Sequence, residues 1–234
     1  MKDLILMLDT ETANTLVTKN GKLDMTCVLP YDLGLAVTDR SGYIYETDSM
    51  VNRDIFVDEA ELMKSAYYAK KIPIYINDIQ AGTRRIVTTY EMRKRVIELI
   101  DKYHIKHVCA HNARFDINAL NNIQRWTTKS KYCYFFPVSV EVWDTMRMAT
   151  DTICKQPTYK KFCVKNGYMT KNNQVRKTAE ILYRYITREH EFKEAHTGLE
   201  DVLIEIAIMA HCFKQHKKMR KILFESPIAK SAKA

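Results

Sequence analysis

The sequence predicts an α/β domain in which helices flank a partly antiparallel, mixed sheet. Two observations carry this prediction: strand-like segments, including a β-hairpin, concentrate in the first half, and the second half is mainly helical. With 234 residues and 46% hydrophobic content, the chain can bury a substantial core. We expect one domain over residues 1–222, with helical insertions near 58–104 and 155–187, and a flexible tail over 223–234.

The predicted strands are short apolar runs bounded by turn residues. Residues 3–9 form the first, and residues 32–39 and 42–50 form an antiparallel hairpin through a turn at Gly42. Residues 107–110 and 138–144 are two further candidate strands. We expect all of them in one sheet.

Helices are predicted where apolar residues recur at helical spacing. The helix expected over residues 58–71 should end at Pro73, because proline interrupts a helix. The expected helices cover residues 58–71, 89–104, a segment starting near Phe115, a segment ending near Ile153, 178–187 and 198–216. The last of these is apolar on two faces, one of which includes Leu203, and should therefore be packed on both.

Net charge, cysteine content and the first residues indicate which classes of partner, site and location to expect. The net charge of +9 favours a polyanionic partner without identifying one. The six cysteines stand singly, with no CxxC pair, so we expect them reduced and mostly buried rather than in a zinc site or a disulfide framework. The first residues lack the long apolar stretch of a signal peptide or membrane span, so a cytoplasmic protein without a membrane partner is expected.

Two carboxylates stand at the end of the first predicted strand, in DLILMLDTETANT. Asp9 and Glu11 are two residues apart, so on a strand they point to the same face. Adjacent buried anions repel each other and resist desolvation. Either a cation lies between them, or a turn has already brought them into water.

Three further residues form the rest of the candidate site. Asp116 opens a helix directly after the buried strand 107–110, a position where open α/β sheets place active residues. Asp201 lies between the two apolar faces of the last helix, and His196 precedes it by five residues. Each has an ordinary alternative: a first-turn acid, a partner of a lysine and a surface histidine. Together with Asp9 and Glu11, they match the needs of two hard divalent cations and one proton acceptor.

Three stretches resemble the motifs of a known family. LDTETAN, HNARFD and HTGLED resemble, in this order and spacing, the three motifs of the DEDDh family of 3′-to-5′ exonucleases. The resemblance implies a ribonuclease-H-like fold over most of residues 1–215. The chain is also similar to exonuclease-like proteins of bacteriophages and to proofreading-type exonuclease domains of DNA polymerase III.

The resemblance also implies the roles of residues. Two Mg²⁺ or Mn²⁺ ions would be bound by Asp9, Glu11, Asp116 and Asp201, and His196 would deprotonate the attacking water. The residues expected to shape the pocket for the terminal nucleotide are Thr10, Thr12, Asn112 and Phe115, although core packing is favoured slightly for Phe115. His111 is expected to be structural, and Asp144 to cap a helix.

A basic segment suggests where nucleic acid would bind. From Thr152 to Ala179 there is no acidic residue, and the lysines include Lys160, Lys161 and Lys165. They alternate with the aromatic residues Tyr159, Phe162 and Tyr168. Lysines neutralise phosphates and aromatic rings stack on unpaired bases. The alternative is a solvated helix face with Phe162 in the core.

The sequence therefore favours a metal-dependent exonuclease that shortens single-stranded 3′ ends, with DNA expected and nucleoside 5′-monophosphates as products. A replication or repair protein is a candidate partner, and the host cytoplasm is the expected location if the chain is phage-encoded. Two alternatives stay open: an RNA-trimming exonuclease of the same family, and a nucleic-acid-binding module without activity.

Overall fold

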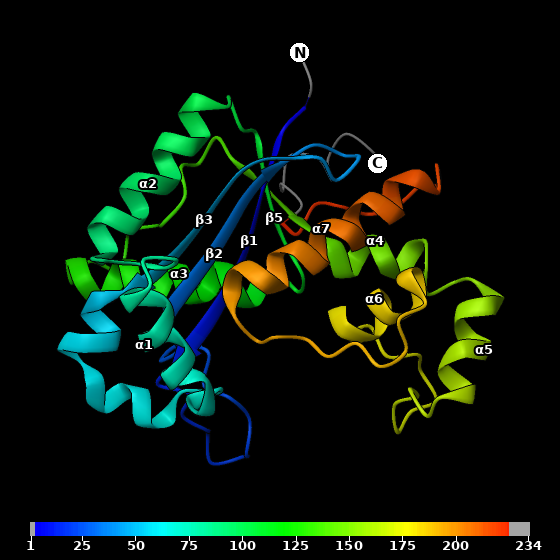
Figure 1. Cartoon of the computed structure of the whole chain (residues 1–234), viewed down its shortest axis with the longest axis horizontal. Coiled ribbons are helices and arrows are strands. Elements are labelled where there is room, and N and C mark those ends of the chain that lie inside the picture. Colours follow the sequence, from blue (N-terminus) through cyan, green and yellow to red (C-terminus); the bar gives the residue numbers. More distant parts are fainter. Residues whose placement is uncertain (1–2, 225–234) are drawn as a thin grey trace.

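The computed structural model describes residues 3–224, which form a six-stranded mixed sheet covered by helices on both faces (Figure 1). The strand order is β4-β3-β2-β1-β5-β6. The strands are β1 (Ile5–Ala13), β2 (Leu29–Thr38), β3 (Ile44–Asn52), β4 (Arg85–Val87), β5 (His107–Ala110) and β6 (Glu141–Asp144). β1, β2 and β3 are antiparallel neighbours, whereas β1/β5, β5/β6 and β3/β4 pair in parallel.

β1 lies in the middle of the sheet, and its alternating side chains supply both cores. Ile5 and Met7 pack into a cluster with residues of α4 (Thr145–Asp151), α5 (Pro157–Lys165), α6 (Ala179–Thr187) and α7 (Gly198–Lys214). Leu6 and Leu8 pack on the other face with residues of α2 (Thr89–Lys102) and α3 (Arg114–Thr128). Figure 1 shows the two helical layers on either side of the strands.

The segment between β3 and β4 differs from the prediction of one helix over residues 58–71. It contains a short π-helix (η1, Asp54–Asp58), two 3₁₀ helices (η2, Ala60–Ser65; η3, Ala69–Lys71) and then α1 (Ile72–Gln80). Pro73 stands in the first turn of α1 rather than ending a helix. Proline fits there because the first amide groups of a helix have no intrahelical acceptor.

The other predicted elements lie where they were expected, with three differences. β1 continues past Asp9 to Ala13, with a register shift between Glu11 and Thr12, because β2 provides a long partner. The strand predicted over 138–144 is confined to β6. Leu203 of α7 is 42% exposed, although the helix is buried on two faces as predicted.

The first residue of the predicted tail contacts the sheet. Leu223 is buried, and its amide group donates a hydrogen bond of 2.8 Å to the Val142 carbonyl oxygen on β6. Residues 225–234 of the predicted tail lie outside the described residues. All six cysteines are unpaired, as expected, and three of them are buried. No helix within residues 3–224 is long and apolar enough to cross a membrane.

Candidate active site

The two carboxylates of β1 face α7. Asp9 pairs in register with Gly34 of β2, and Glu11 pairs with Asp32. Both acids line a cavity of about 530 Å³ at the end of the sheet. The chain therefore holds the two carboxylates on a central strand, where neighbouring strands keep the backbone rigid.

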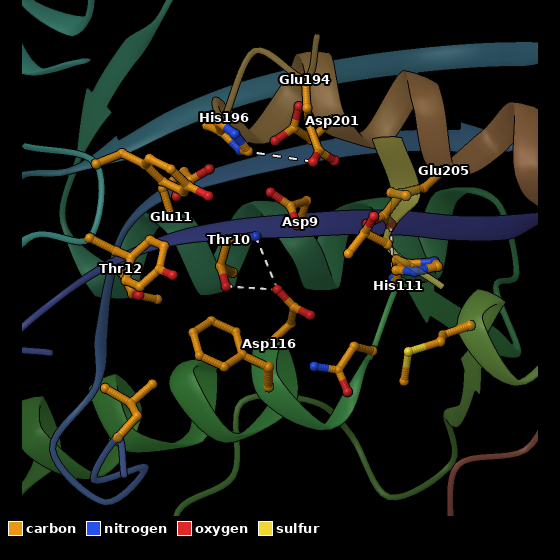
Figure 2. Close-up of a pocket in the computed structure, with 18 of the residues that line it drawn as sticks. Asp9, Thr10, Glu11, Thr12, His111, Asp116, Glu194, His196, Asp201 and Glu205 are labelled. Carbon is orange, nitrogen blue, oxygen red and sulfur yellow. Dashed lines mark hydrogen bonds and ion pairs between the residues drawn. The ribbon is translucent and has the colours of Figure 1, made fainter. Parts of the chain in front are cut away.

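Asp116 reaches the same cavity from the opposite side of the sheet, at the start of α3. Its Oδ1 atom accepts two hydrogen bonds from Thr10, one from the amide group (3.1 Å) and one from the hydroxyl group (2.8 Å). In Figure 2, Asp9 lies between Asp116 on one side and Asp201 on the other. Thr10, predicted to shape the nucleotide pocket, therefore connects the first motif to the second.

α7 brings the third motif to the cavity. The Gly198 amide group donates a 2.8 Å hydrogen bond to Oδ2 of the fully buried Asp32, which attaches the start of α7 to β2. Asp201 follows in the first turn, and its carboxylate accepts a hydrogen bond from the His196 amide group (Figure 2). Potential ligand atoms of Glu11, His196 and Asp201 lie within 4.8 Å of one another.

Burial raises the pKa values of the four candidate metal-binding carboxyl groups in the cavity. Burial, followed by repulsion from Asp201, raises the pKa of Glu11 to about 9. Burial raises the pKa of Asp201 to about 8 and that of Asp116 to about 7, and burial with repulsion from Asp116 raises that of Asp9. The pKa of His196 is lowered, mainly by burial, so its neutral form is favoured.

Two acidic residues of the cavity were missed in the sequence. Glu205 is 3% exposed and accepts a 3.0 Å hydrogen bond from the His111 amide group. Glu194 lines the cavity beside His196, and its Oε2 atom lies 3.9 Å from His196 Nδ1. Burial raises the pKa of both carboxyl groups, to about 7 for Glu194. The signal for Glu205 was its position four residues after Asp201, which places both on one helix face.

His111 and Asp144 have structural contacts, as predicted. The two ring nitrogens of His111 bond to the Thr145 hydroxyl group (2.9 Å) and to the Lys177 carbonyl oxygen (2.6 Å). Because a carbonyl oxygen only accepts, the nitrogen facing Lys177 carries the proton. Asp144 caps α4 by accepting a 2.8 Å hydrogen bond from the Met146 amide group.

The predicted substrate-binding residues divide into two groups. Thr12, Asn112 and Phe115 line the cavity, and Phe115 is half-buried there rather than packed in the core. The lysines of α5 lie outside the cavity lining, on an exposed helix face: Lys160, Lys161 and Lys165.

The aromatic residues of the basic segment pack inward, contrary to a role in base stacking. Tyr159 is fully buried, and its hydroxyl group donates a 2.6 Å hydrogen bond to the Arg176 carbonyl oxygen. Phe162 packs against the same core, as the alternative reading expected, and the Tyr168 hydroxyl group accepts a 2.6 Å hydrogen bond from Arg184. All three rings therefore contact the core on the α7 side of the sheet.

The donors present fit a hard divalent cation. Carboxylate oxygens and the His196 imidazole converge on the cavity, and none of the described residues that line it is a cysteine. Oδ1 of Asp201 is buried and has no hydrogen-bond partner among the described residues. A buried carboxylate oxygen without a donor is costly, and a cation would satisfy it.

Comparisons with known proteins support the fold. No protein-family model and no curated protein sequence matches the chain. Among solved structures, the chain is similar to the nuclease domain of 3′hExo, a DEDDh family member bound to rAMP: TM-score 0.53, 12% identity, covering 96% of this chain and 98% of that one. A full-length 3′-exonuclease gives a TM-score of 0.54 at 12% identity over 94% of this chain and 63% of that chain.

An E. coli exonuclease I complex with single-stranded DNA gives a TM-score of 0.50 at 14% identity. There the match covers 93% of this chain but 41% of the other, so the chain spans less than half the length of exonuclease I. In this chain, a six-stranded mixed sheet and its flanking helices carry the three stretches that resemble the DEDDh motifs. The protein therefore has the ribonuclease-H-like fold of the DEDDh 3′-exonucleases.

Proposed function

We propose that this protein is a divalent-metal-dependent 3′-to-5′ exonuclease that acts on single-stranded nucleic acid, with DNA as the expected substrate. One observation carries the proposal. Residues from three distant stretches of the chain line a single cavity. They are Asp9 and Glu11 of the first stretch, Asp116 of the second, and His196 and Asp201 of the third. A chain that only bound nucleic acid would not need four carboxylates in a place where nucleic acid brings further negative charge.

The residues divide into metal ligands and a base. Asp9, Glu11, Asp116 and Asp201 would hold two Mg²⁺ or Mn²⁺ ions, which neutralise the charge that develops on the scissile phosphate. His196 accepts the proton of the attacking water, and burial favours the neutral imidazole that this requires. The water oxygen bonds to phosphorus, the bond to the 3′ oxygen breaks, and that oxygen takes a proton from solvent. The products are a nucleoside 5′-monophosphate and a strand with a new 3′ hydroxyl group.

The nucleic acid would approach along the basic segment. Lys177 and Thr178 line the cavity, and the exposed lysines of α5 precede them in the chain. Contacts from these lysines to phosphates would add affinity without reading the base sequence. An RNA-trimming activity is the second candidate, because one structural neighbour was solved with rAMP and another with single-stranded DNA. A recruiting replication or repair protein stays a proposal.

The test uses 5′-labelled DNA and RNA oligonucleotides of matched sequence with Mg²⁺ or Mn²⁺. The wild-type protein should produce a ladder that shortens from the 3′ end, and the faster ladder identifies DNA or RNA. Asp9→Asn should slow shortening at least about a hundredfold. Asp101→Asn is the matched control, because Asp101 is exposed on α2, outside the cavity lining. Oligonucleotide that is bound but never shortened would favour a binding module instead.

A further inference from the structure

The imidazole of His196 is stacked on an aromatic ring from a distant part of the chain. The Tyr68 and His196 ring centroids are 4.1 Å apart, and the ring planes differ by 11°. Tyr68 is half-buried, lines the same cavity and lies between η2 and η3, in the segment where no α-helix formed. Its neighbour Tyr67 packs edge-on against it, with centroids 4.9 Å apart and planes at 81°.

The segment that carries Tyr68 is attached to the strand that carries Glu11. The Tyr67 amide group donates a 3.1 Å hydrogen bond to the Thr12 carbonyl oxygen at the end of β1. Two further hydrogen bonds follow along the chain, from the Thr15 hydroxyl group to the Ser65 carbonyl oxygen and from the Asn14 amide group to the Leu62 carbonyl oxygen. The Tyr68 ring is thus placed relative to the first motif, while His196 belongs to the third.

His196 lies in a stretch without regular secondary structure. It precedes α7 and has a φ of +54°, a left-handed conformation that few residues other than glycine adopt. Its side chain is 31% exposed. A stacked ring fixes the plane of the imidazole and occupies neither nitrogen, so both stay available for a proton and for the neighbouring carboxylates.

We infer that Tyr68 is a positioning residue for His196: its ring holds the imidazole plane in the orientation that faces Glu11 and Asp201. This inference rests on the proposed function, in which His196 is the base. The ring face is the part of Tyr68 that acts, so phenylalanine should replace it and an aliphatic residue should not. The competing role, a stacking surface for a nucleobase of the substrate, predicts a change in substrate binding instead.

The kinetic test compares Tyr68→Phe, Tyr68→Leu and the exposed-tyrosine control Tyr90→Leu, which is outside the cavity lining. Tyr68→Leu should lower kcat about tenfold with KM nearly unchanged, because a misoriented base slows the chemical step. Tyr68→Phe and Tyr90→Leu should stay within about twofold of wild type. In a His196→Ala background, Tyr68→Leu should cause no further loss. A rise in KM, or an equal loss in the His196→Ala background, would overturn the inference.

A second measurement does not depend on activity. In proton NMR of the metal-free protein, the His196 ring protons should carry a ring-current shift from Tyr68, and the missing signals of His196→Ala assign them. The shift should persist in Tyr68→Phe and disappear in Tyr68→Leu. If the wild-type protein shortens no oligonucleotide, the proposed function fails. If the wild-type protein shortens oligonucleotide, but Tyr68→Leu leaves both kcat and the chemical shifts of the His196 ring protons unchanged, the positioning role alone fails.

Discussion

Gly34 on β2 and Gly198 at the start of α7 lie backbone against backbone. A Cβ atom on Gly198 would stand 2.6 Å from the Gly34 amide nitrogen, and one on Gly34 would overlap the Gly198 carbonyl group. Gly34 is also the register partner of Asp9. The two glycines therefore let α7 approach the sheet at the level of Asp9, which brings Asp201 into the cavity one turn later.

Replacing Gly34 by alanine should push α7 away from the sheet. We expect Gly34→Ala to lower the free energy of unfolding by about 1–3 kcal/mol, because backbone atoms cannot yield as side chains do, and to reduce activity as well. Gly167→Ala is the control: apart from its chain neighbours, no atom of residues 3–224 lies within 4 Å of the added methyl group, and only the strain of a φ of +71° is introduced. Equal urea midpoints and activities for the two variants would contradict this account.

A buried ion-pair network fixes the same junction. The Arg84 side chain is 3% exposed and contacts Asp32 at 3.3 Å, Asp78 at 2.8 Å and Glu200 at 2.7 Å. Arg84→Met should lower the free energy of unfolding by about 3–5 kcal/mol, because Asp32 is left buried without a cation. Arg85→Met, at a 53% exposed side chain paired with Asp48, should cost less than about 1 kcal/mol.

The double variant Asp32→Asn/Arg84→Met separates the charge from the packing. It should be less destabilised than Arg84→Met alone, since no uncompensated charge then remains buried. Urea unfolding of the four proteins measures these differences, and a double variant as unstable as the sum of its parts would count against the network.

The metal-free protein should lose stability as pH rises. The pKa of Glu11 is about 9 in the folded protein against 4.5 ordinarily, so folding favours the protonated form. This contribution is complete below pH 4.5 and is lost as pH rises towards 9. The Tm of Glu11→Gln should therefore fall less steeply than that of wild type between about pH 5 and about pH 9, the interval between the two pKa values of Glu11. Equal slopes for both proteins in chelator would contradict the shift.

Mg²⁺ or Mn²⁺ should reverse that loss. A cation that binds only the folded protein raises Tm as its concentration exceeds Kd, and the effect should be largest at alkaline pH, where the carboxylates are ionised. Thermal unfolding with and without the ion measures this, with Asp201→Asn as the variant expected to respond less. A response equal to wild type would argue against Asp201 as a ligand.

His196→Ala should lower kcat by about 10²–10⁴, the range for removal of a general base. Because burial lowers the pKa of His196 from 6.5, the neutral form persists to lower pH, and the acidic limb of the pH profile should lie below pH 6.5. The limb should be absent from the residual activity of the variant. An unchanged rate would remove the assignment of His196 as the base.

Glu205 should matter through its hydrogen bond to the His111 amide group. Glu205→Gln keeps an acceptor for that amide, and we expect it to change the free energy of unfolding little. Glu205→Leu leaves a buried donor unpaired and should cost about 1–3 kcal/mol. Urea unfolding at pH 7 compares them, and equal losses in the two variants would show that the charge of Glu205, rather than its hydrogen bond, is what matters.

The site residues could be found in the sequence because each motif lies on a regular element. Asp9 and Glu11 share a face by strand alternation, and Asp116 and Asp201 occupy first turns of helices whose periodicity is clear. Glu205 was missed because a glutamate on a helix is usually exposed to solvent. The prediction of one helix over 58–71 was wrong, since these residues form short π and 3₁₀ helices. Tertiary contacts override helical propensity there.

The sequence by itself determined five of the six strands, the order of the three motifs and the residue types that a metal-dependent hydrolase needs, since local periodicity and composition carry that information. Tertiary structure decided what depends on contacts between distant segments. These are the close approach of Gly198 to Gly34, the inward packing of Tyr159 and the stack of Tyr68 on His196. The physical reason is that strand and helix periods are local properties, whereas the meeting of two side chains depends on how the whole chain packs.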